Sequence, residues 1–218
     1  MTINDVVARF NTVPFLFVGS GLSRRYLNTP DWKGLLKHFA AQISNDPFVY
    51  NSYVSKAKME CYTESVLPVV AELIQRDYDE KWFSTPEIRS QDEAVLQAVM
   101  DGVSPFKAEI AKYFRSFTTT VQKYDAEIHK LKDLSVRNIA GVITTNYDCF
   151  LEDLFGNYTK YIGQSELIFS PLQGIAEIYK IHGSVEKPDS LVINETDYTV
   201  FSSKCGYLAA KLMTIFVE

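Results

Sequence analysis

The sequence predicts an α/β fold: a Rossmann-like parallel sheet flanked by helices, with a helical insertion over about residues 47–135. Two continuous apolar stretches, residues 14–18 and 141–144, are typical of strands that are buried on both faces, as in a parallel sheet. Glycines follow the first stretch and polar side chains follow the second, where open α/β sheets bind ligands. Between the two stretches the apolar residues recur at helical spacing.

The predicted elements before the insertion are a helix, a strand and a second helix. Apolar residues at helical spacing predict a short helix over residues 3–10. The strand over residues 14–18 ends in Gly-Ser-Gly. Asp31 then precedes an apolar helical stripe that runs to Ile43, so we expect Asp31 to cap the start of that helix.

The insertion has its clearest helix after Ser104-Pro105. Serine is a good N-cap and proline suits the first position of a helix, and the apolar residues that follow share one helical face. The elements expected after the insertion are strands over residues 141–144 and 178–181, a helix near 149–154, a short strand over 190–194, a helical turn capped by Thr196, and a last helix over 207–215.

Composition excludes several classes of protein. The 218 residues are 46% hydrophobic, enough for one sizeable core. A net charge of -5 argues against nucleic acid as the main partner, because phosphate neutralisation needs a basic face. No run approaches the about 20 apolar residues of a membrane span, and the first ten residues do not form a signal peptide. We therefore expect a cytoplasmic protein.

The three cysteines give no metal site. Cys61, Cys149 and Cys205 lie far apart and form no C-x-x-C pair. This pattern is typical of reduced thiols in a cytoplasm, and it predicts neither zinc nor another bound metal.

The glycine-containing loop at residues 18–24 reads Val-Gly-Ser-Gly-Leu-Ser-Arg. Glycines after a buried strand let backbone N–H groups approach a phosphate closely. Arg24 stands at the third glycine position of the dinucleotide-binding pattern, so the fingerprint is incomplete. This stretch alone fits both a phosphate loop and a plain turn.

A polar cluster, Thr-Thr-Asn-Tyr-Asp at residues 144–148, follows the second predicted strand. Its position at the carboxyl end of a parallel strand is where chemistry would be placed. The structural alternative is a turn in which Asp148 caps the next helix.

His182 is one of three histidines and stands at the end of the strand over residues 178–181, followed by Gly183. The other two, His38 and His129, lie in helical stripes. A lone histidine is usually structural, but one beside two other strand-end motifs is a candidate general base near neutral pH.

Together these motifs resemble the sirtuin family. The family's G-A-G-I-S is matched by Gly-Ser-Gly-Leu-Ser at residues 19–23, and its P-D-F by Pro-Asp-Trp at 30–32. Its T-Q-N-x-D is matched by residues 144–148, and its catalytic H-G by His182 and Gly183. The matches occur in the family's order and span about residues 15–184.

One departure narrows the resemblance. Protein deacylases of the family carry a zinc ribbon of two C-x-x-C pairs after the catalytic histidine, and no cysteine lies between His182 and Cys205. The stretch after His182 is instead similar to the sirtuin-like domains of bacterial anti-phage defence effectors, which hydrolyse NAD. The resemblance therefore implies an NAD glycohydrolase, with NAD as its substrate.

The resemblance also implies roles for individual residues. His182 would accept a proton and Asn146 would orient ribose or water, while Asp31 and Asp148 would bind the nicotinamide side. The glycine loop would hold the pyrophosphate. The residues expected to contact NAD, besides the catalytic His182 and Asn146, are Gly19, Ser20, Gly21, Leu22, Ser23, Arg24, Asp31, Thr145, Tyr147, Asp148, Gly183 and Ser184.

Two other functions stay open. One is a nucleotide-binding sensor without catalysis, and the other is an NAD-dependent protein deacylase or ADP-ribosyltransferase. The last predicted helix ends in apolar residues without a cap, so we expect the chain to be the N-terminal part of a longer protein that lacks its last sheet strand here. We expect a homo-oligomer, or a partner protein or domain, to restrain the activity.

Overall fold

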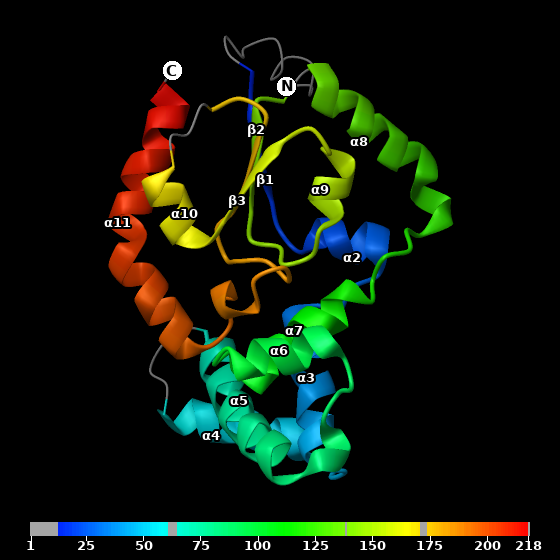
Figure 1. Ribbon diagram of the computed structural model, residues 1–218, viewed down its shortest axis with the longest axis vertical. Coiled ribbons are helices and arrows are strands. Elements are labelled where there is room, and N and C mark those ends of the chain that lie inside the picture. The colour runs from blue at the N-terminus through cyan, green and yellow to red at the C-terminus, as the bar shows by residue number, and fades with distance from the viewer. Residues whose placement is uncertain (1–12, 61–64, 138, 171–173, 218) are drawn as a thin grey trace.

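The computed structural model describes residues 13–60, 65–137, 139–170 and 174–217, and it contains a parallel four-stranded sheet (Figure 1). The strands lie in the order β1-β2-β4-β3, and β2 pairs with β1 from Phe15 opposite Gly141. A side chain at Gly141 would collide with the Phe15 ring and the Glu177 carbonyl, which explains the glycine there. The strands are β1 (Phe15–Val18), β2 (Gly141–Thr144), β3 (Thr159–Ile162) and β4 (Glu177–Lys180).

Helices cover both faces of this sheet (Figure 1). Alternate side chains of a strand point to opposite faces. Val142 and Ile178 therefore pack toward α2 (Gly21–Leu27), α8 (Asp125–Arg137) and α9 (Phe150–Leu154). Ile143 and Tyr179 pack on the other face, toward α10 (Gly163–Phe169) and α11 (Glu195–Val217). Burial on both faces explains why β2 and β4 are wholly buried.

A group of helices lies beyond one end of the sheet, at the bottom of Figure 1. Its core joins aromatic and aliphatic side chains such as Phe39, Tyr78 and Phe106. Leu191 and Ile193, from the segment before α11, pack into the same core. The helices are α3 (Trp32–Ile43), α4 (Val49–Glu60), α5 (Leu67–Ser84), α6 (Glu93–Met100) and α7 (Pro105–Arg115), with 3-10 turns η1 (Pro86–Ile88), η2 (Gln122–Tyr124) and η3 (Pro188–Ser190) elsewhere in the chain.

The fold class and three of the predicted strands are confirmed. The stretches 14–18, 141–144 and 178–181 correspond to β1, β2 and β4. The predicted caps are also present: Asp31 accepts a hydrogen bond from the Gly34 backbone N–H at 2.7 Å, and Ser104 accepts one from the Lys107 N–H. Helices alone occupy the described part of residues 47–135, apart from turns and loops.

Other expectations at the C-terminal end were wrong. Residues 190–194 form no strand, because their apolar side chains pack singly into the helical core instead of pairing along a sheet. Asn194, not Thr196, caps the following helix, since its Oδ1 accepts from the Asp197 N–H at 2.7 Å. The expected last helix over 207–215 is the second half of α11, and β3 and α10 were not predicted.

Strand β1 is less buried than predicted: its apolar run was expected to be covered on both faces. It forms an edge of the described sheet, and the Phe17 side chain is 71% exposed. The helix expected over residues 3–10 lies outside the described residues. Among the residues that are described, none of the helices combines the length and the apolar character that crossing a lipid bilayer requires.

Candidate functional site

A cavity of about 170 Å³ lies where the carboxyl ends of β1, β2 and β4 meet the helices α3 and α7. Segments from distant parts of the chain converge on it, as expected at the carboxyl edge of a parallel sheet. Eight of the residues predicted from the sequence line it. The full lining is Ser20, Ser23, Thr29, Pro30, Asp31, Trp32, Leu35, Phe114, Thr145, Asn146, Tyr147, Asp148, His182 and Tyr198.

The threonine that ends β2 builds the loop that carries Asn146. Thr144 Oγ1 donates to the Val18 carbonyl at 2.9 Å and accepts from the Asn146 backbone N–H at 3.0 Å. The Thr144 side chain thus joins the ends of two neighbouring strands. This explains why a polar residue closes a strand that is otherwise apolar.

Asn146 is 5% exposed, and its side chain reaches across to the glycine loop. Its Nδ2 donates to the Gly19 carbonyl at 3.1 Å and to Ser23 Oγ at 2.9 Å. These two bonds fix the amide orientation, so Oδ1 is the acceptor left over. Asn146 Oδ1 is buried and has no hydrogen-bond partner among the described residues.

Trp32 supplies a second unpaired polar atom at the same cavity. Its indole Nε1, a donor, is buried without a partner among the described residues. The ring of Trp32 stacks on Tyr198 at a centroid distance of 5.8 Å. Buried polar atoms are normally hydrogen-bonded, so an orphaned acceptor and an orphaned donor around one cavity indicate a place where a ligand or water binds.

His182 follows β4 at the edge of the cavity, and its imidazole packs against two aromatic rings. Tyr198 and Phe201 contact its imidazole edge to face, at centroid distances of 5.6 and 5.0 Å. Burial lowers the pKa of His182 below its ordinary value. The imidazole is therefore neutral at pH 7 and able to accept a proton.

Tyr147 and Asp148 have structural roles as well as positions at the cavity. The Tyr147 hydroxyl donates to the Val192 carbonyl at 2.7 Å, and burial raises its pKa. Asp148 Oδ1 accepts from the Phe150 N–H at 3.1 Å, which forms the turn of the structural alternative, but the N-cap of α9 is Cys149 and not Asp148. Since the Asp148 carbonyl also accepts from the buried Lys180 ammonium, the loop is fixed at several points.

Six of the predicted residues do not line the cavity. In the glycine loop, a side chain at Gly19 or Gly21 would meet no atom within 4 Å, so protein packing does not require either glycine. Gly183 is required, because its φ of 87° is left-handed and a side chain would collide with the Ser190 backbone. The predicted residues that lie outside the lining are Gly19, Gly21, Leu22, Arg24, Gly183 and Ser184.

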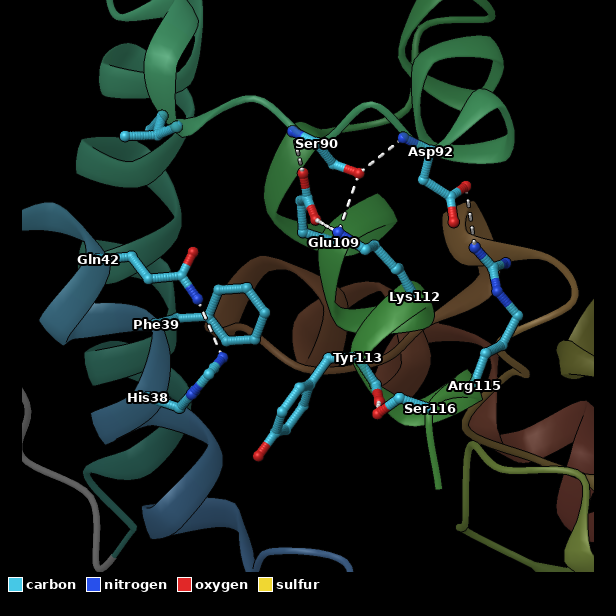
Figure 2. Close-up of a pocket in the computed structure, with 11 residues that line it drawn as sticks. His38, Phe39, Gln42, Ser90, Asp92, Glu109, Lys112, Tyr113, Arg115 and Ser116 are labelled. Carbon is cyan, nitrogen blue, oxygen red and sulfur yellow. Dashed lines mark hydrogen bonds and ion pairs between the residues drawn. The ribbon is translucent and has the colours of Figure 1, made fainter. Parts of the chain in front are cut away.

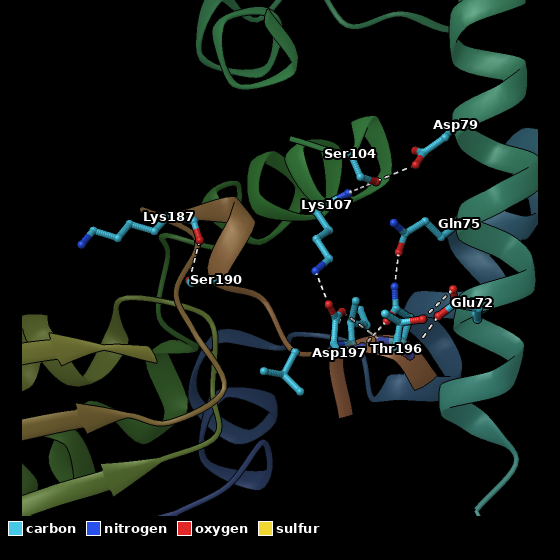
Figure 3. A network of polar contacts seen from close by, with 12 residues as sticks. Glu72, Gln75, Asp79, Ser104, Lys107, Lys187, Ser190, Thr196 and Asp197 are labelled. Carbon is cyan, nitrogen blue, oxygen red and sulfur yellow. Dashed lines mark hydrogen bonds and ion pairs between the residues drawn. The ribbon is translucent and has the colours of Figure 1, made fainter. Parts of the chain in front are cut away.

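The wall formed by the start of α11 is anchored in the helical group (Figure 3). Lys107 Nζ, on α7, lies 2.5 Å from Asp197 Oδ1, and both side chains are largely buried. Asp197 Oδ2 in turn accepts from the Ile193 and Asn194 backbone N–H groups. Glu72, on α5, accepts from the Thr196 N–H and hydroxyl. These contacts fix the turn that presents Tyr198 to His182.

Several lining residues were not predicted as site residues. Trp32 follows Asp31 in the quoted Pro-Asp-Trp motif, and Tyr198 follows Asp197 in the stretch after His182, so both had a sequence signal. Leu35 and Phe114 come from the apolar faces of α3 and α7. Nothing in a helical stripe distinguishes a residue that lines a cavity from one that fills the core.

One group of potential metal ligands lies outside the cavity lining. The ligand atoms of Cys149, Glu152 and Glu186 lie within 4.8 Å of one another. Lysine ammonium groups already pair with both carboxylates: Lys180 Nζ lies 2.8 Å from Glu152 Oε1, and Lys160 pairs with Glu186. Burial raises the pKa of the Cys149 thiol to about 11, which disfavours the thiolate that metals bind. The donor set therefore suits a cation poorly.

Comparison with protein families gives one match. Residues 140–218 match the model of the SIR2-like domain. The matched part begins at β2 and includes Asn146, His182 and Tyr198, whereas the glycine loop and Trp32 lie before it. A search of curated proteins gave no match.

Proposed function

From the premise that this chain carries a sirtuin-like domain, we propose that it is an NAD glycohydrolase, which cleaves the bond between nicotinamide and ribose. SIR2-like domains use NAD as a substrate, and the present chain has a cavity at the position where such a sheet binds ligands. The observation that carries the proposal is that one cavity is lined both by a neutral imidazole, that of His182, and by Asn146 Oδ1, an acceptor without a hydrogen-bond partner among the described residues.

Hydrolysis joins NAD and water to give nicotinamide, ADP-ribose and one proton. Nicotinamide leaves as a neutral ring, so no acid is needed to protonate it. The protein has to position the ribose, stabilise positive charge on it and take a proton from the attacking water or a ribose hydroxyl. His182 is the group that accepts this proton, since it is neutral and lies at the cavity edge.

The orphaned atoms of the cavity suit a polar ligand with donors and acceptors. Asn146 Oδ1 accepts from a ribose hydroxyl or from the attacking water, while its Nδ2 holds the glycine loop. Trp32 Nε1 donates to an acceptor on the substrate. Asp31 and Asp148 border the same space and are placed to contact the nicotinamide side.

The cavity volume limits how much of the substrate is enclosed. About 170 Å³ is below the about 300–1,000 Å³ typical of sites for drug-sized ligands, and a dinucleotide is larger still. We infer that the cavity encloses the nicotinamide and part of its ribose. The pyrophosphate would lie along the exposed Gly19 and Gly21, where the absence of side chains leaves open space.

One assay separates this proposal from its alternatives. The protein is incubated with NAD alone, and free nicotinamide and ADP-ribose are quantified over time. A glycohydrolase releases both in equal amounts, a deacylase or an ADP-ribosyltransferase needs a second substrate, and a sensor releases neither. Absence of nicotinamide at saturating NAD, with binding of NAD intact, would overturn this proposal in favour of a sensor or of an enzyme that needs a second substrate.

The wider biological role is also a proposal. Depletion of NAD in anti-phage defence follows from the resemblance to defence effectors, and such an activity would need restraint by oligomerisation, a partner or a further domain. The edge strand β1, with Phe17 exposed beside it, is a surface on which such an association could form. A cytoplasmic location fits a substrate that is found there.

A further inference from the structure

A second cavity, of about 490 Å³, lies within the helical group and shares no lining residue with the candidate site (Figure 2). It is bounded by α3, α7 and the segment between η1 and α6. The same two helices border both spaces, since Leu35 and Phe114 line the candidate site while His38 and Tyr113 line this one. Its volume is in the range of sites for small organic ligands.

Two cations point into this cavity from one face of α7. Lys112 and Arg115 are three residues apart, a spacing that places both side chains on the same side of a helix (Figure 2). Lys112 Nζ donates to Ser90 Oγ at 2.9 Å. Arg115 Nη1 donates to the Val185 carbonyl at 3.3 Å. A lysine has three N–H donors and an arginine five, so most of these donors are not used in the bonds described.

A carboxylate lies at ion-pair distance from each of these cations but does not hydrogen-bond to it. Glu109 Oε2 lies 3.6 Å from Lys112 Nζ, and Asp92 Oδ1 lies 3.8 Å from Arg115 Nη2, both beyond hydrogen-bond distance. Both acids also serve other groups. Asp92 Oδ1 caps α6 by accepting from the Val95 N–H, and Glu109 Oε1 accepts from the Ser90 N–H. What these ion pairs leave available to an anion is the set of Lys112 and Arg115 N–H donors that make no hydrogen bond described here.

An aromatic wall stands opposite the charged side. The His38 imidazole stacks on the Tyr113 ring at a centroid distance of 4.3 Å and an angle of 17°. Phe39 meets the Tyr113 ring edge-on at 6.1 Å. Burial lowers the pKa of His38, so the imidazole is neutral at pH 7 and adds no charge to this wall. A planar, uncharged part of a ligand would find apolar contact here.

We propose that this cavity binds a small organic phosphate with a planar ring, of the class of nucleoside monophosphates. The phosphate lies between Lys112 and Arg115, because guanidinium and phosphate pair through two parallel hydrogen bonds and the ammonium adds a third contact. The ring lies against the His38–Tyr113 pair. Binding at this place requires no residue of the candidate site, so it is independent of NAD turnover.

The first test measures binding of uridine 5′-monophosphate to the full chain by isothermal titration calorimetry. Uridine is chosen because it lacks the adenine and nicotinamide that an NAD site would select. The variant Lys112→Gln/Arg115→Gln is compared with Lys33→Gln/Lys37→Gln, which removes the same charge from exposed positions of α3 outside the cavity. Thermal melts of both variants verify that they fold.

We expect the Lys112→Gln/Arg115→Gln variant to weaken binding by about tenfold or more, and the Lys33→Gln/Lys37→Gln variant to bind as the parent does. Uridine and inorganic phosphate, each titrated alone, should bind more weakly than the nucleotide. The proposal is overturned by the absence of saturable binding, or by equal losses in the two variants. Inorganic phosphate that binds as tightly as the nucleotide would exclude recognition of the ring.

Discussion

The two sides of the candidate site are built in different ways. The sheet side consists of the segments that directly follow β1, β2 and β4, and these carry Ser23, at the start of α2, Asn146 and His182. Its polar atoms are set by short-range contacts at the strand ends, such as those of Thr144 Oγ1. The helical side consists of Trp32, Leu35, Phe114 and Tyr198, which are placed by packing and by the Lys107–Asp197 ion pair.

The two sides therefore have different roles: the sheet side provides the reactive polar groups, and the helical side determines the shape of the cavity. The sheet side holds the groups that can accept a proton or a hydrogen bond from a substrate, and each stands directly after a strand end. The helical side closes the cavity and places Tyr198 and Trp32 against its contents. Changes on the sheet side should therefore abolish turnover in a folded protein, whereas changes on the helical side should act through stability and substrate binding.

The largest effect is expected for the proton acceptor. His182→Ala should lower NAD turnover by about a hundredfold to ten-thousandfold, because a general base contributes about that factor. His129→Ala is the matched control, since His129 is exposed on α8 and its Nδ1 hydrogen-bonds with the Asp125 carbonyl of the same helix. Nicotinamide release is the measurement. Near-parental turnover of folded His182→Ala would refute the assignment.

Asn146 should come next on the sheet side. Asn146→Ala should lower turnover by about 10²–10³-fold, the effect of removing one well-placed polar contact in a transition state. Ser23→Ala isolates the structural part of this effect, because it removes one partner of Asn146 Nδ2 and leaves Oδ1 in place. Similar losses in the two variants would mean that Asn146 acts only by holding the glycine loop.

The helical side is tested at its ion pair. Lys107→Met leaves the largely buried Asp197 without its cation and should lower the free energy of unfolding by about 3 kcal/mol. Arg76→Met breaks an exposed ion pair on α5 and should change it by less than about 0.5 kcal/mol. Denaturant unfolding measures both. We also expect Lys107→Met to raise KM for NAD. Unchanged stability together with an unchanged KM would show that the ion pair does not help to hold the helical side of the site.

The pH dependence of turnover should report the environment of His182. Burial lowers its pKa below the ordinary value of 6.5, and the neutral form is the proton acceptor. Turnover should therefore be level above the inflection and fall about tenfold per pH unit below it. The inflection should lie below pH 6.5 and disappear in His182→Ala. An inflection above pH 6.5 would contradict the burial of this imidazole.

Acidification should also destabilise the fold through the same residue. A histidine whose pKa is lower in the folded state binds its proton more readily when unfolded, so its contribution to stability is present above pH 6.5 and is lost as the pH falls. Circular dichroism across the pH range separates this loss of structure from the loss of a proton acceptor.

The smallest effect is expected from metal chelators. The three cysteines cannot form a four-thiolate zinc site, and lysines pair with the carboxylates beside Cys149. Incubation with a chelator should leave turnover and melting temperature unchanged. Stoichiometric zinc in elemental analysis of the purified protein would contradict this prediction.

The sequence was informative where an element is continuous and self-contained. The runs that became β2 and β4 are apolar because both faces of these two central strands are covered. The two edge strands differ: β1 has an apolar run although it is not fully buried, whereas β3, Thr-Lys-Tyr-Ile, has none. Leu191 and Ile193 led to a strand being predicted where there is none. A segment without sheet partners can also bury alternate side chains, here in the helical core.

The same distinction explains the site. The position of Asn146 and His182 at the cavity could be predicted because side chains that follow parallel strands meet at the carboxyl edge of the sheet. Phe114 and Leu35 could not, because their role depends on how the helical group meets the sheet, which no local pattern encodes. Trp32 and Tyr198 were within reach, because Trp32 is part of the Pro-Asp-Trp motif and Tyr198 belongs to the stretch after His182 that carries the narrower resemblance.

The position of the helical group between β1 and β2 also has a consequence for how the protein folds. Thr144 and Val18, which are joined by a hydrogen bond at the site, are 126 residues apart in the chain. Closing so long a loop costs conformational entropy before the strand contacts can stabilise the chain, so pairing of this kind is slow. The helices in between can gain structure locally and bring the two strands together. The order of assembly would then be helices first, sheet second, and the cavity last, so that the protein acquires its candidate catalytic site only at the final step of folding.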